Sequence, residues 1–499
     1  MGKFMCGIGK YTKSGIDLKK NLISAIFICG LILGYSVSVL GQTEMENLQK
    51  YQYYRQRFDT YFMVVGNNSG ESLVVCNRNR NLGANLCFGQ HGVHFGYYLG
   101  MLATEYALLE RDNQPLQATS TLNELVSALD AFCEQLDKCE NYFGEEKRLD
   151  GFFIRENVPM DYLDSTQALG QYHLSLLNKN RTSEQIYDKN TGSFVGLQKG
   201  EPGYANTLFE VEAQKLPMSQ DEAYGVMMGL ALVKKCVPDL AERAKYLFEL
   251  ITLHIIGKNG QNGCPNEGYM IKKPDCRSIS ESTGGNTAFL AYGIAAAAEK
   301  VTEKPRETFV NTFTAEDRKY SIQNYWRKGK LYIPIGKNNM YYIWKICGNG
   351  VPGQQEWNRA MASTLGAIGD SWGKRTDRAI TKNVYWTKGE KKHDWRTFYL
   401  SLWRFLHDKQ GNDTEKQMIV NELNLAPKYG PYNYKSADFP SNFAGGGWAY
   451  TYRYRATISE QFEGSTFVGT FNGLDYMLMY NLYQLLYASS DGSLPKYHK

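Results

Sequence analysis

The sequence lacks the charge imbalance and the motifs that mark several large classes of protein. Its net charge is only +5 over 499 residues. No basic stripe, zinc-finger spacing or recognition-module motif is present, which argues against a nucleic-acid partner. Gly-rich phosphate loops, a Gly-x-Ser-x-Gly elbow and a His-Glu-x-x-His motif are also missing. Nucleotide-dependent enzymes, ordinary serine esterases and zinc proteases are therefore excluded, and neither a cofactor nor a metal site is expected.

Long uncharged runs are scarce, and the one that exists lies near the N-terminus. Lys19 and Lys20 precede the uncharged residues 22–40, and Val39-Leu40-Gly41 then precede Gln42. A basic flank, an apolar run and small residues before a cleavage position are typical of a signal peptide. We expect residues 1–41 to be a signal peptide, with an uncleaved membrane anchor as the alternative. The mature chain is then exported, to the periplasm or the extracellular space, and touches a membrane only through an uncleaved N-terminal segment.

Cysteine is sparse, and eight of the ten cysteines follow the leader. They are Cys76, Cys87, Cys133, Cys139, Cys236, Cys264, Cys276 and Cys347. An even number in an exported chain permits disulfides, although free buried thiols are the alternative. Cys76 and Cys87 bracket one Gly/Asn-rich loop, and Cys264 and Cys276 bracket another, so each pair could form a disulfide that closes its loop. Cys133 and Cys139 lie ~9 Å apart along a helix, so they can join only if that helix ends near Leu136.

Aromatic residues are abundant in an otherwise ordinary globular composition. The chain is 43% hydrophobic and 21% charged, and it contains 36 Tyr, 23 Phe and 8 Trp. Flat apolar faces with a polar edge suit ring-shaped polar ligands. A helical core that needs large side chains explains the same excess.

Two kinds of helix alternate along the chain. Five segments are apolar on all faces and follow a polar loop: residues 95–109, 221–235, 285–300, 355–370 and 471–487. Such helices must be surrounded by protein and predict an inner layer. The segments 119–139, 239–256, near 303–314 and 394–408 carry a single apolar stripe and predict an outer layer. The polar loops that open the inner helices are then expected at one end of the molecule.

The remaining segments predict smaller elements. A helix is expected at 44–63, a loop at 77–82, a strand-like piece at 149–155, a helix at 162–177, a hairpin at 330–345 and a short helix at 415–423. No linker rich in Pro, Ser or Gly divides the chain, so residues 42–499 are expected to form one domain.

The chain resembles the six-hairpin (α/α)6 toroids of glycoside hydrolases and polysaccharide lyases. The resemblance is carried by the openings of the inner helices around Gln90-His91, Asp221-Glu222, Glu281, Glu356 and Glu460 to Asp475. It is architectural and covers most of residues 45–488. It implies an all-α fold with small β-hairpin insertions and a funnel that binds an oligo- or polysaccharide. The resemblance does not assign a catalytic residue, since fold does not imply function.

Glycoside hydrolysis needs two carboxyl groups across a sugar bond. Asp221 stands at the start of an inner helix, where the helix dipole stabilises a carboxylate. Capping of the helix by Asp221 or Ser219 explains the same residues. Glu281 lies in a loop of small residues that can approach a ligand closely, or it is simply exposed.

Glu460 and Glu463 are further candidates, because they lie among aromatic residues. Burial beside such rings raises the pKa of a carboxyl group, as a general acid requires. Ion pairs with Arg453 or Arg455 are the alternative for these two. Asp475 lies inside the last apolar helix and is interpreted as structural, since a buried carboxylate must be paired.

Several residues near the same openings are candidates for holding a substrate. They are Gln90, Glu222, Tyr224, Trp357, Trp448 and Arg80. Trp448 follows three glycines in a loop, which makes it the preferred stacking surface for a sugar ring.

The competing chemistry is β-elimination from a uronic-acid glycan. It needs a base and a group that neutralises the sugar carboxylate. Those types are supplied by His91, His94, Tyr97 and the neighbouring Gln90, with Arg78 or Arg80. Core or capping roles explain the two histidines equally well. The sequence therefore predicts a glycoside hydrolase with Asp221 and one of Glu281, Glu460 or Glu463 as the acid/base pair. A lyase using His91, and a toroid that binds glycans without turnover, are the alternatives.

Overall fold

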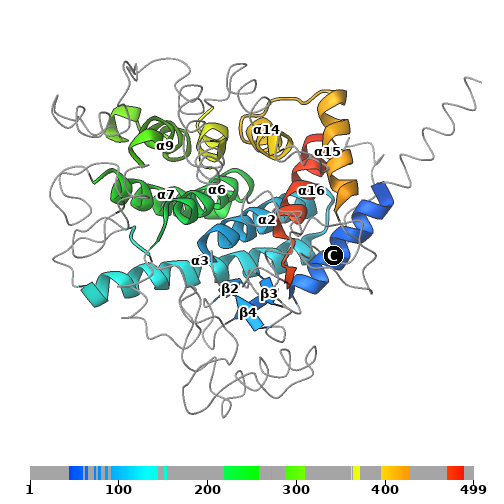
Figure 1. Ribbon diagram of the computed structural model, residues 1–499, viewed down its shortest axis with the longest axis horizontal. Helices are drawn as coiled ribbons and strands as arrows, with labels where there is room; N and C mark the ends of the chain where they lie inside the picture. Colours follow the sequence, from blue (N-terminus) through cyan, green and yellow to red (C-terminus); the bar gives the residue numbers. More distant parts are fainter. Residues whose placement is uncertain are drawn as a thin grey trace, which may run out of the picture.

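The computed structural model describes the chain in segments that are mostly helical (Figure 1). The described residues are 44–59, 62–65, 72–74, 77–79, 85–87, 91–143, 151–153, 218–257, 271, 287–309, 361, 363–370, 395–426 and 469–487. The predicted all-α class is confirmed for this part of the chain, in which each strand has only three residues.

Most of the predicted helices are present, with ends that shift by a few residues. The helices are α2 (His91–Arg111), α3 (Pro115–Phe143), α6 (Gln220–Cys236), α7 (Ala241–Ile256), α9 (Thr287–Thr302), α14 (Trp395–Leu406), α15 (Asp413–Leu425) and α16 (Leu474–Tyr487). Residues 44–59 and 363–368 are also helical. Short 3-10 helices cover Pro238–Leu240 and Arg306–Phe309. The second one stands where an outer helix was expected near 303–314.

Helices α2 and α6 run in the same direction and touch through their backbones. Gly92 faces the Cβ of Glu222 near both helix starts. One turn further on, a Cβ on Gly96 would lie 1.8 Å from the carbonyl oxygen of Gly225, and a Cβ on Gly229 would lie 2.5 Å from that of Gly96. Only glycine permits so close an approach. These glycines explain why the two inner helices carry small residues among large apolar ones.

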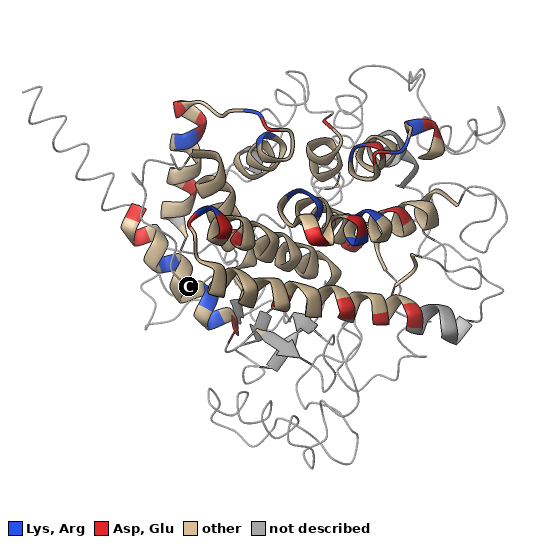
Figure 2. Ribbon diagram, turned by 180° about the vertical axis from the view of Figure 1, so that it is seen from behind, with Lys and Arg blue, Asp and Glu red and all other residues tan. Residues whose placement is uncertain are grey.

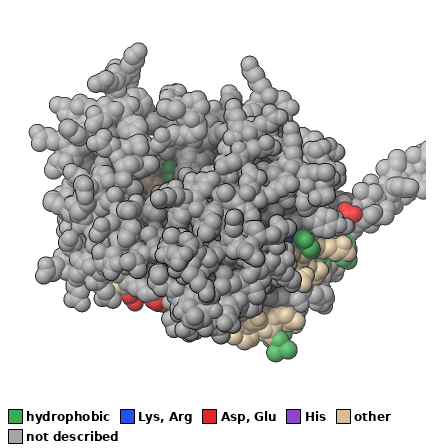
Figure 3. All heavy atoms as spheres, turned by 60° about the horizontal axis from the view of Figure 1, so that its bottom comes forward, with side chains coloured by type: hydrophobic (Ala, Val, Ile, Leu, Met, Phe, Trp, Pro, Cys, Tyr) green, Lys and Arg blue, Asp and Glu red, His purple; other side chains and the backbone are tan. Residues whose placement is uncertain are grey.

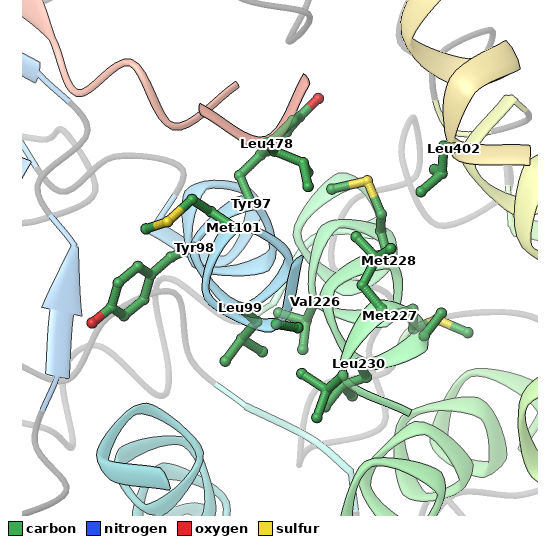
Figure 4. Close-up of a cluster of buried hydrophobic side chains, with 14 of the residues drawn as sticks. Tyr97, Tyr98, Leu99, Met101, Val226, Met227, Met228, Leu230, Leu402 and Leu478 are labelled. Atoms are coloured by element: carbon green, nitrogen blue, oxygen red, sulfur yellow. The ribbon is translucent and has the colours of Figure 1, made fainter. Parts of the chain in front are cut away.

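Helix α16 runs alongside α2 in the same direction. Near their starts, Asn472 bonds to His94 at 2.8 Å. At their far ends, the Arg111 guanidinium donates to the carbonyl oxygen of Gln484 at 2.8 Å. The interior between α2, α6 and α16 is filled by Leu, Met and Tyr side chains, which Figure 4 shows.

Helix α14 belongs to this inner group, and the prediction that it is an outer helix is wrong. Its first turn places Phe398 against the ring of Tyr97 on α2, with centroids 5.6 Å apart. Beyond its last turn, Asp408 accepts from Lys235 at the end of α6 at 2.6 Å. Leu402 of α14 is fully buried and faces the side of α6 that carries Met228 (Figure 4).

Helix α9 and the segment 363–368 end at the same end of the molecule as α6 and α14. Lys234 of α6 bonds to Glu303, just after α9, at 2.8 Å. His407 bonds to the carbonyl oxygen of Ala367 at 2.8 Å. Gly369 lies against the backbone of α9 at Ala296, where an added Cβ would be 2.9 Å away.

Outer helices cover the inner ones and run against them. In α3, the predicted stripe that contains Leu125, Leu129 and Phe132 is buried. Acidic residues follow the other side of this helix towards its end (Figure 2). The helix 44–59 runs antiparallel to α16, since Glu44 accepts from Tyr483 and the rings of Tyr54 and Tyr476 lie 4.8 Å apart.

A buried ionic network joins the helix 44–59 to α2 and α3. Arg55 is 3% exposed and bonds to the carboxylate of Glu105 at 3.1 Å. It also donates to Glu124 and pairs with Asp59. Glu105 is fully buried and accepts from the hydroxyl of Tyr51 at 2.7 Å. A buried carboxylate of this kind needs such partners to remain charged.

Two small antiparallel sheets lie beside the helices. Strands β1 (Met63–Val65) and β2 (Ser72–Val74) form a pair, while β3 (Asn77–Asn79) lies between β4 (Asn85–Cys87) and β5 (Gly469–Phe471). The predicted loop at 77–82 is therefore wrong at its start, and the predicted helix 44–63 ends too late. Strand β3 pairs with β4 nearby and with β5 far away in the sequence, and its three residues are all polar, so no alternation of apolar residues marks it.

The piece expected to be strand-like at 149–155 has no strand in its described residues, 151–153. Gly151 has a φ of +80° and lies against the backbone of α7 at Leu250, where a Cβ would be 2.1 Å from the carbonyl oxygen. The left-handed turn explains the glycine. The predicted helix 162–177 and hairpin 330–345 lie outside the described residues.

Two of the cysteines are free thiols in the structure. Cys133 and Cys236 form no disulfide. Helix α3 continues without a break past Leu136 to Phe143, so the condition for a bridge between Cys133 and Cys139 is not met. The other proposed bridges are untested, since Cys76, Cys264 and Cys276 lie outside the described residues.

Candidate functional site at the common start of the helices

The structure brings the starts of α2, α6, α14 and α16 together at one end. The contacts that join them are Gly92 with Glu222, His94 with Asn472, and Tyr97 with Phe398. This is the gathering of helix openings that the sequence predicts. Polar side chains from distant segments of the chain meet here, as His94 and Asn472 do.

The start of α6 is a complete capping box. The backbone N–H of Ser219 donates to the carboxylate of Glu222 at 3.0 Å. In return, the Ser219 side chain accepts from the backbone N–H of Glu222, the third residue of the helix. Glu222 is fully buried. The Ser219 hydroxyl also donates to Asp221 at 2.5 Å. Two carboxylates thus stand in the first turn of α6, where the helix dipole stabilises negative charge.

Asp221 and Glu222 differ in their access to solvent. Asp221 is partly exposed, whereas Glu222 points into the contact with Gly92. Of the two, Asp221 is the carboxylate that a ligand can reach. Glu222 serves as the second half of the cap. The sequence left a capping role open for Asp221 or Ser219, and the predicted role of Glu222 in holding substrate stays a prediction.

His94 and Asn472 form a buried hydrogen bond between α2 and the start of α16. The Asn472 amide nitrogen lies 2.8 Å from Nδ1 of His94, and its amide oxygen accepts from the backbone N–H of Leu474 at 3.1 Å. His94 is 5% exposed and Asn472 is 2% exposed. The pair ties together two segments that lie at opposite ends of the sequence.

A carboxylate and two phenols lie one turn further into the helices. Tyr97 of α2, Tyr399 of α14 and Asp475 of α16 are all buried. Burial, with the neighbouring Tyr399 and Asp475 adding to it, holds the pKa of Tyr97 well above its usual value. Tyr97 therefore keeps its proton at any physiological pH, so its phenol is not poised to act as a base. Figure 4 shows Tyr97 and Tyr98 leaving α2 in different directions.

Tyr224 lies in the first turns of α6 and is 1% exposed. Its hydroxyl has no hydrogen-bond partner among the described residues, and burial raises the pKa of the phenol. Its predicted role as a surface that holds substrate is untested. Its ring is part of the core in the described part of the chain.

The remaining predicted site residues are placed only in part. His91 is the first residue of α2 and so stands at the common start of the helices. Gln90, Arg80, Glu281, Trp357, Trp448, Glu460 and Glu463 lie outside the described residues. Their predicted roles stay predictions.

Asn472 and Tyr399 are the residues of this end that the sequence analysis did not single out. Asn472 precedes Gly473 and the last apolar helix, and an Asn before a helix start is a capping signal. The sequence therefore indicates a capping role for Asn472. It does not indicate the second hydrogen bond of Asn472, because the partner, His94, is far away in the sequence. Tyr399 was not expected here because residues 394–408 were predicted to form an outer helix.

The described residues at this end offer acceptors and donors of several kinds. Asp221 is a partly exposed carboxylate and Asp475 is a buried one. His94 and Asn472 share a hydrogen bond, and Tyr97 is a protonated phenol. In the segments that the structure describes, no group of three or more His, Cys, Asp or Glu side chains is arranged to hold a metal ion.

The surface of the described residues shows few large apolar side chains. Those that are exposed are Met45, Tyr53, Leu116 and Tyr246. On the face that Figure 3 shows, hydrophobic side chains of the described residues reach the surface at separate points. Among the described helices, none is long and apolar enough to cross a membrane.

Comparison with known proteins returned no relative. No family model, no curated protein and no solved structure matches the chain.

Proposed function

We propose that the chain is an exported, single-domain (α/α)6 toroid that hydrolyses glycosidic bonds in an oligo- or polysaccharide. The succession of contacts between neighbouring helices supports the toroid. It runs from α2 to α6, α9, the segment 363–368, α14 and α16, and it returns from α16 to α2. Six inner helices in a closed series, with the described outer helices around them, are what this architecture requires.

The observation that carries the proposed activity is the position of Asp221. It is the partly exposed carboxylate at the end where four inner helices start. Hydrolysis of a glycosidic bond needs one carboxyl group to transfer a proton and a second one as base or nucleophile. In this proposal Asp221 is one of the pair, and Glu281, Glu460 or Glu463 supplies the other. The N-terminal segment 1–41 supports export.

The first experiment compares the wild-type protein with Asp221→Asn on a panel of neutral and uronic-acid polysaccharides. Asparagine can still accept the hydrogen bond from Ser219, so the helix start is retained while the charge is lost. We expect kcat/KM to fall by about 10²–10⁴, the usual contribution of a general acid or base. Release of reducing ends and ultraviolet absorbance are measured together.

The matched control is Asp239→Asn, at the opposite end of α6, which should leave kcat/KM unchanged. Full activity of Asp221→Asn would remove Asp221 from the proposed mechanism. A rise in ultraviolet absorbance together with reducing ends would indicate β-elimination and point to His91. Binding without turnover on the panel would contradict the proposed activity in favour of a glycan-binding protein.

A further inference from the structure

The side-chain amide of Asn472 is held from two sides. On one side it meets the backbone N–H of Leu474, at the start of α16, at 3.1 Å. On the other side it meets Nδ1 of His94, on α2, at 2.8 Å. All three residues are buried, so water does not substitute readily for either partner.

These two contacts determine where the proton of His94 resides. The backbone N–H of Leu474 can only donate, so the amide atom that faces it must be the oxygen of Asn472. The atom that faces His94 is then the NH2 group, which also can only donate. Nδ1 of His94 must therefore be the unprotonated acceptor. In the neutral ring the proton is on Nε2.

We propose that Asn472 is a positioning residue that holds His94 as the neutral Nε2–H tautomer, and that the pair is a proton-sensitive joint between α2 and α16. When His94 is protonated, both ring nitrogens carry hydrogen, and Nδ1–H faces the NH2 group of Asn472. The two groups must then separate, or the amide must turn and give up its bond to Leu474. In either case the start of α16 loosens from α2.

Other titratable groups lie at this end of the described helices. Asp475 stands in the first turn of α16, Asp221 and Glu222 stand in that of α6, and Tyr97 and Tyr399 come from α2 and α14. A pH profile of stability alone would mix their contributions with that of His94. The test must therefore observe the protons of His94 directly.

The decisive measurement is the ¹⁵N spectrum of the histidine side chains in the full-length protein, with His94 assigned through His94→Gln. At neutral pH we expect a proton on Nε2 and none on Nδ1. In Asn472→Asp, a carboxylate oxygen replaces the NH2 group, so Nδ1 should gain a proton. A proton on Nδ1 in the wild-type protein would overturn the proposal even if the variant failed to fold.

The matched control is Asn481→Asp, at a buried asparagine within α16 that bonds to Tyr51, Met101 and Thr104 rather than to a histidine. It should leave the His94 signals unchanged. An equal change in both variants would mean that the added charge, and not the position of Asn472, alters the ring.

Amide hydrogen exchange tests the joint itself. As His94 is protonated, the amides at the start of α16 should lose protection by about tenfold, since a buried hydrogen bond is replaced by two facing donors. In His94→Gln, whose amide oxygen can accept from Asn472 but does not titrate, protection should not vary over the same pH range. Equal behaviour of the two proteins would overturn the joint.

Any effect of the joint on catalysis rests on the proposed function. If the tautomer and the exchange results are found but no glycan is turned over, the proposed function fails and the joint stands. If glycans are hydrolysed and Nδ1 carries the proton, the joint fails and the proposed function stands.

Discussion

His407 illustrates how the surroundings of one side chain make stability depend on pH. It follows α14 and bonds to the carbonyl oxygen of Ala367 at 2.8 Å. Burial lowers the pKa of His407 below its usual value of 6.5, although Ala367 and Asp370 act in the opposite direction. Between the lowered pKa and 6.5 the unfolded chain binds more protons than the folded one. Folding stability should therefore fall as the pH falls below about 6.5.

The variant His407→Gln tests this dependence, because its amide can still donate to Ala367 but does not titrate. Chemical unfolding should show wild-type stability decreasing between pH 7.5 and 5.5, with each unit of pKa shift worth about 1.4 kcal/mol. The variant should show a smaller decrease. Parallel curves for the two proteins would mean that His407 does not titrate differently on folding.

At the same scale, the sequence indicated part of the candidate site but not the roles of its residues. The string from Ser219 to Glu222 was found because it stands before an apolar helix. Capping and catalysis need the same residue types there, so the pattern could not separate Glu222, which completes the cap, from Asp221, which remains partly exposed. Only the fold brings Asn472 to His94.

At the scale of elements, the contact between α2 and α6 depends on glycine. Gly96→Ala places a methyl group 1.8 Å from a backbone carbonyl oxygen, and backbone cannot move aside as a side chain can. Overpacking of this kind costs about 1–3 kcal/mol or more. We expect a loss of at least this size in the free energy of unfolding, measured by denaturant titration.

Gly100→Ala, one turn further along α2, is the matched control. Its new methyl group would meet only the ends of the Leu232 and Leu478 side chains, which can adjust. Both variants gain about 1 kcal/mol of helix propensity, so their difference isolates the backbone contact. Equal stabilities would show that α2 and α6 can separate at no cost.

Helix α14 shows why a periodic pattern can misplace an element. Its charged residues and single apolar stripe are typical of an outer helix. In the structure, Arg404 uses that charge to bind Glu415 of α15 at 2.8 Å, while Phe398 and Leu402 face inward. An inner helix can therefore carry charge where a neighbouring helix supplies the partner. The pattern of charged and apolar residues shows which face of α14 is polar, but it does not show whether that face meets water or another helix.

At the scale of the whole molecule, Arg55 joins three helices through one guanidinium. Removing it leaves the fully buried Glu105 without its ion-pair partner. Breaking a buried pair from one side typically costs about 3–5 kcal/mol. We expect Arg55→Met to lower the free energy of unfolding by that amount, as measured by chemical denaturation.

The double variant Arg55→Met/Glu105→Gln supplies the comparison, because it removes both charges. It should recover a large part of the stability that the single variant loses, since the fully buried carboxylate of Glu105 is gone and the two carboxylates that remain, Glu124 and Asp59, reach solvent. A double variant less stable than Arg55→Met would contradict the assignment of Arg55 as the partner that keeps Glu105 ionised.

The fold was readable from the sequence where its determinants are local. Apolar runs, stripes and polar openings predicted α2, α3, α6, α7, α9, α15 and α16, because periodicity and capping act within one or two turns. The pairing of β3 with β5 and the inner position of α14 depend on partners far away in the chain, and no local pattern encodes them. The same holds for the bond between His94 and Asn472.

The position of α16 has a consequence for how the chain acquires its structure. This helix is made long after α2 and the helix 44–59, yet it packs between them. Until residue 487 has been synthesised, the early helices keep apolar surface uncovered, and contacts of such long sequence separation form slowly. Nascent chains of this protein should therefore depend on chaperones until α16 has been made.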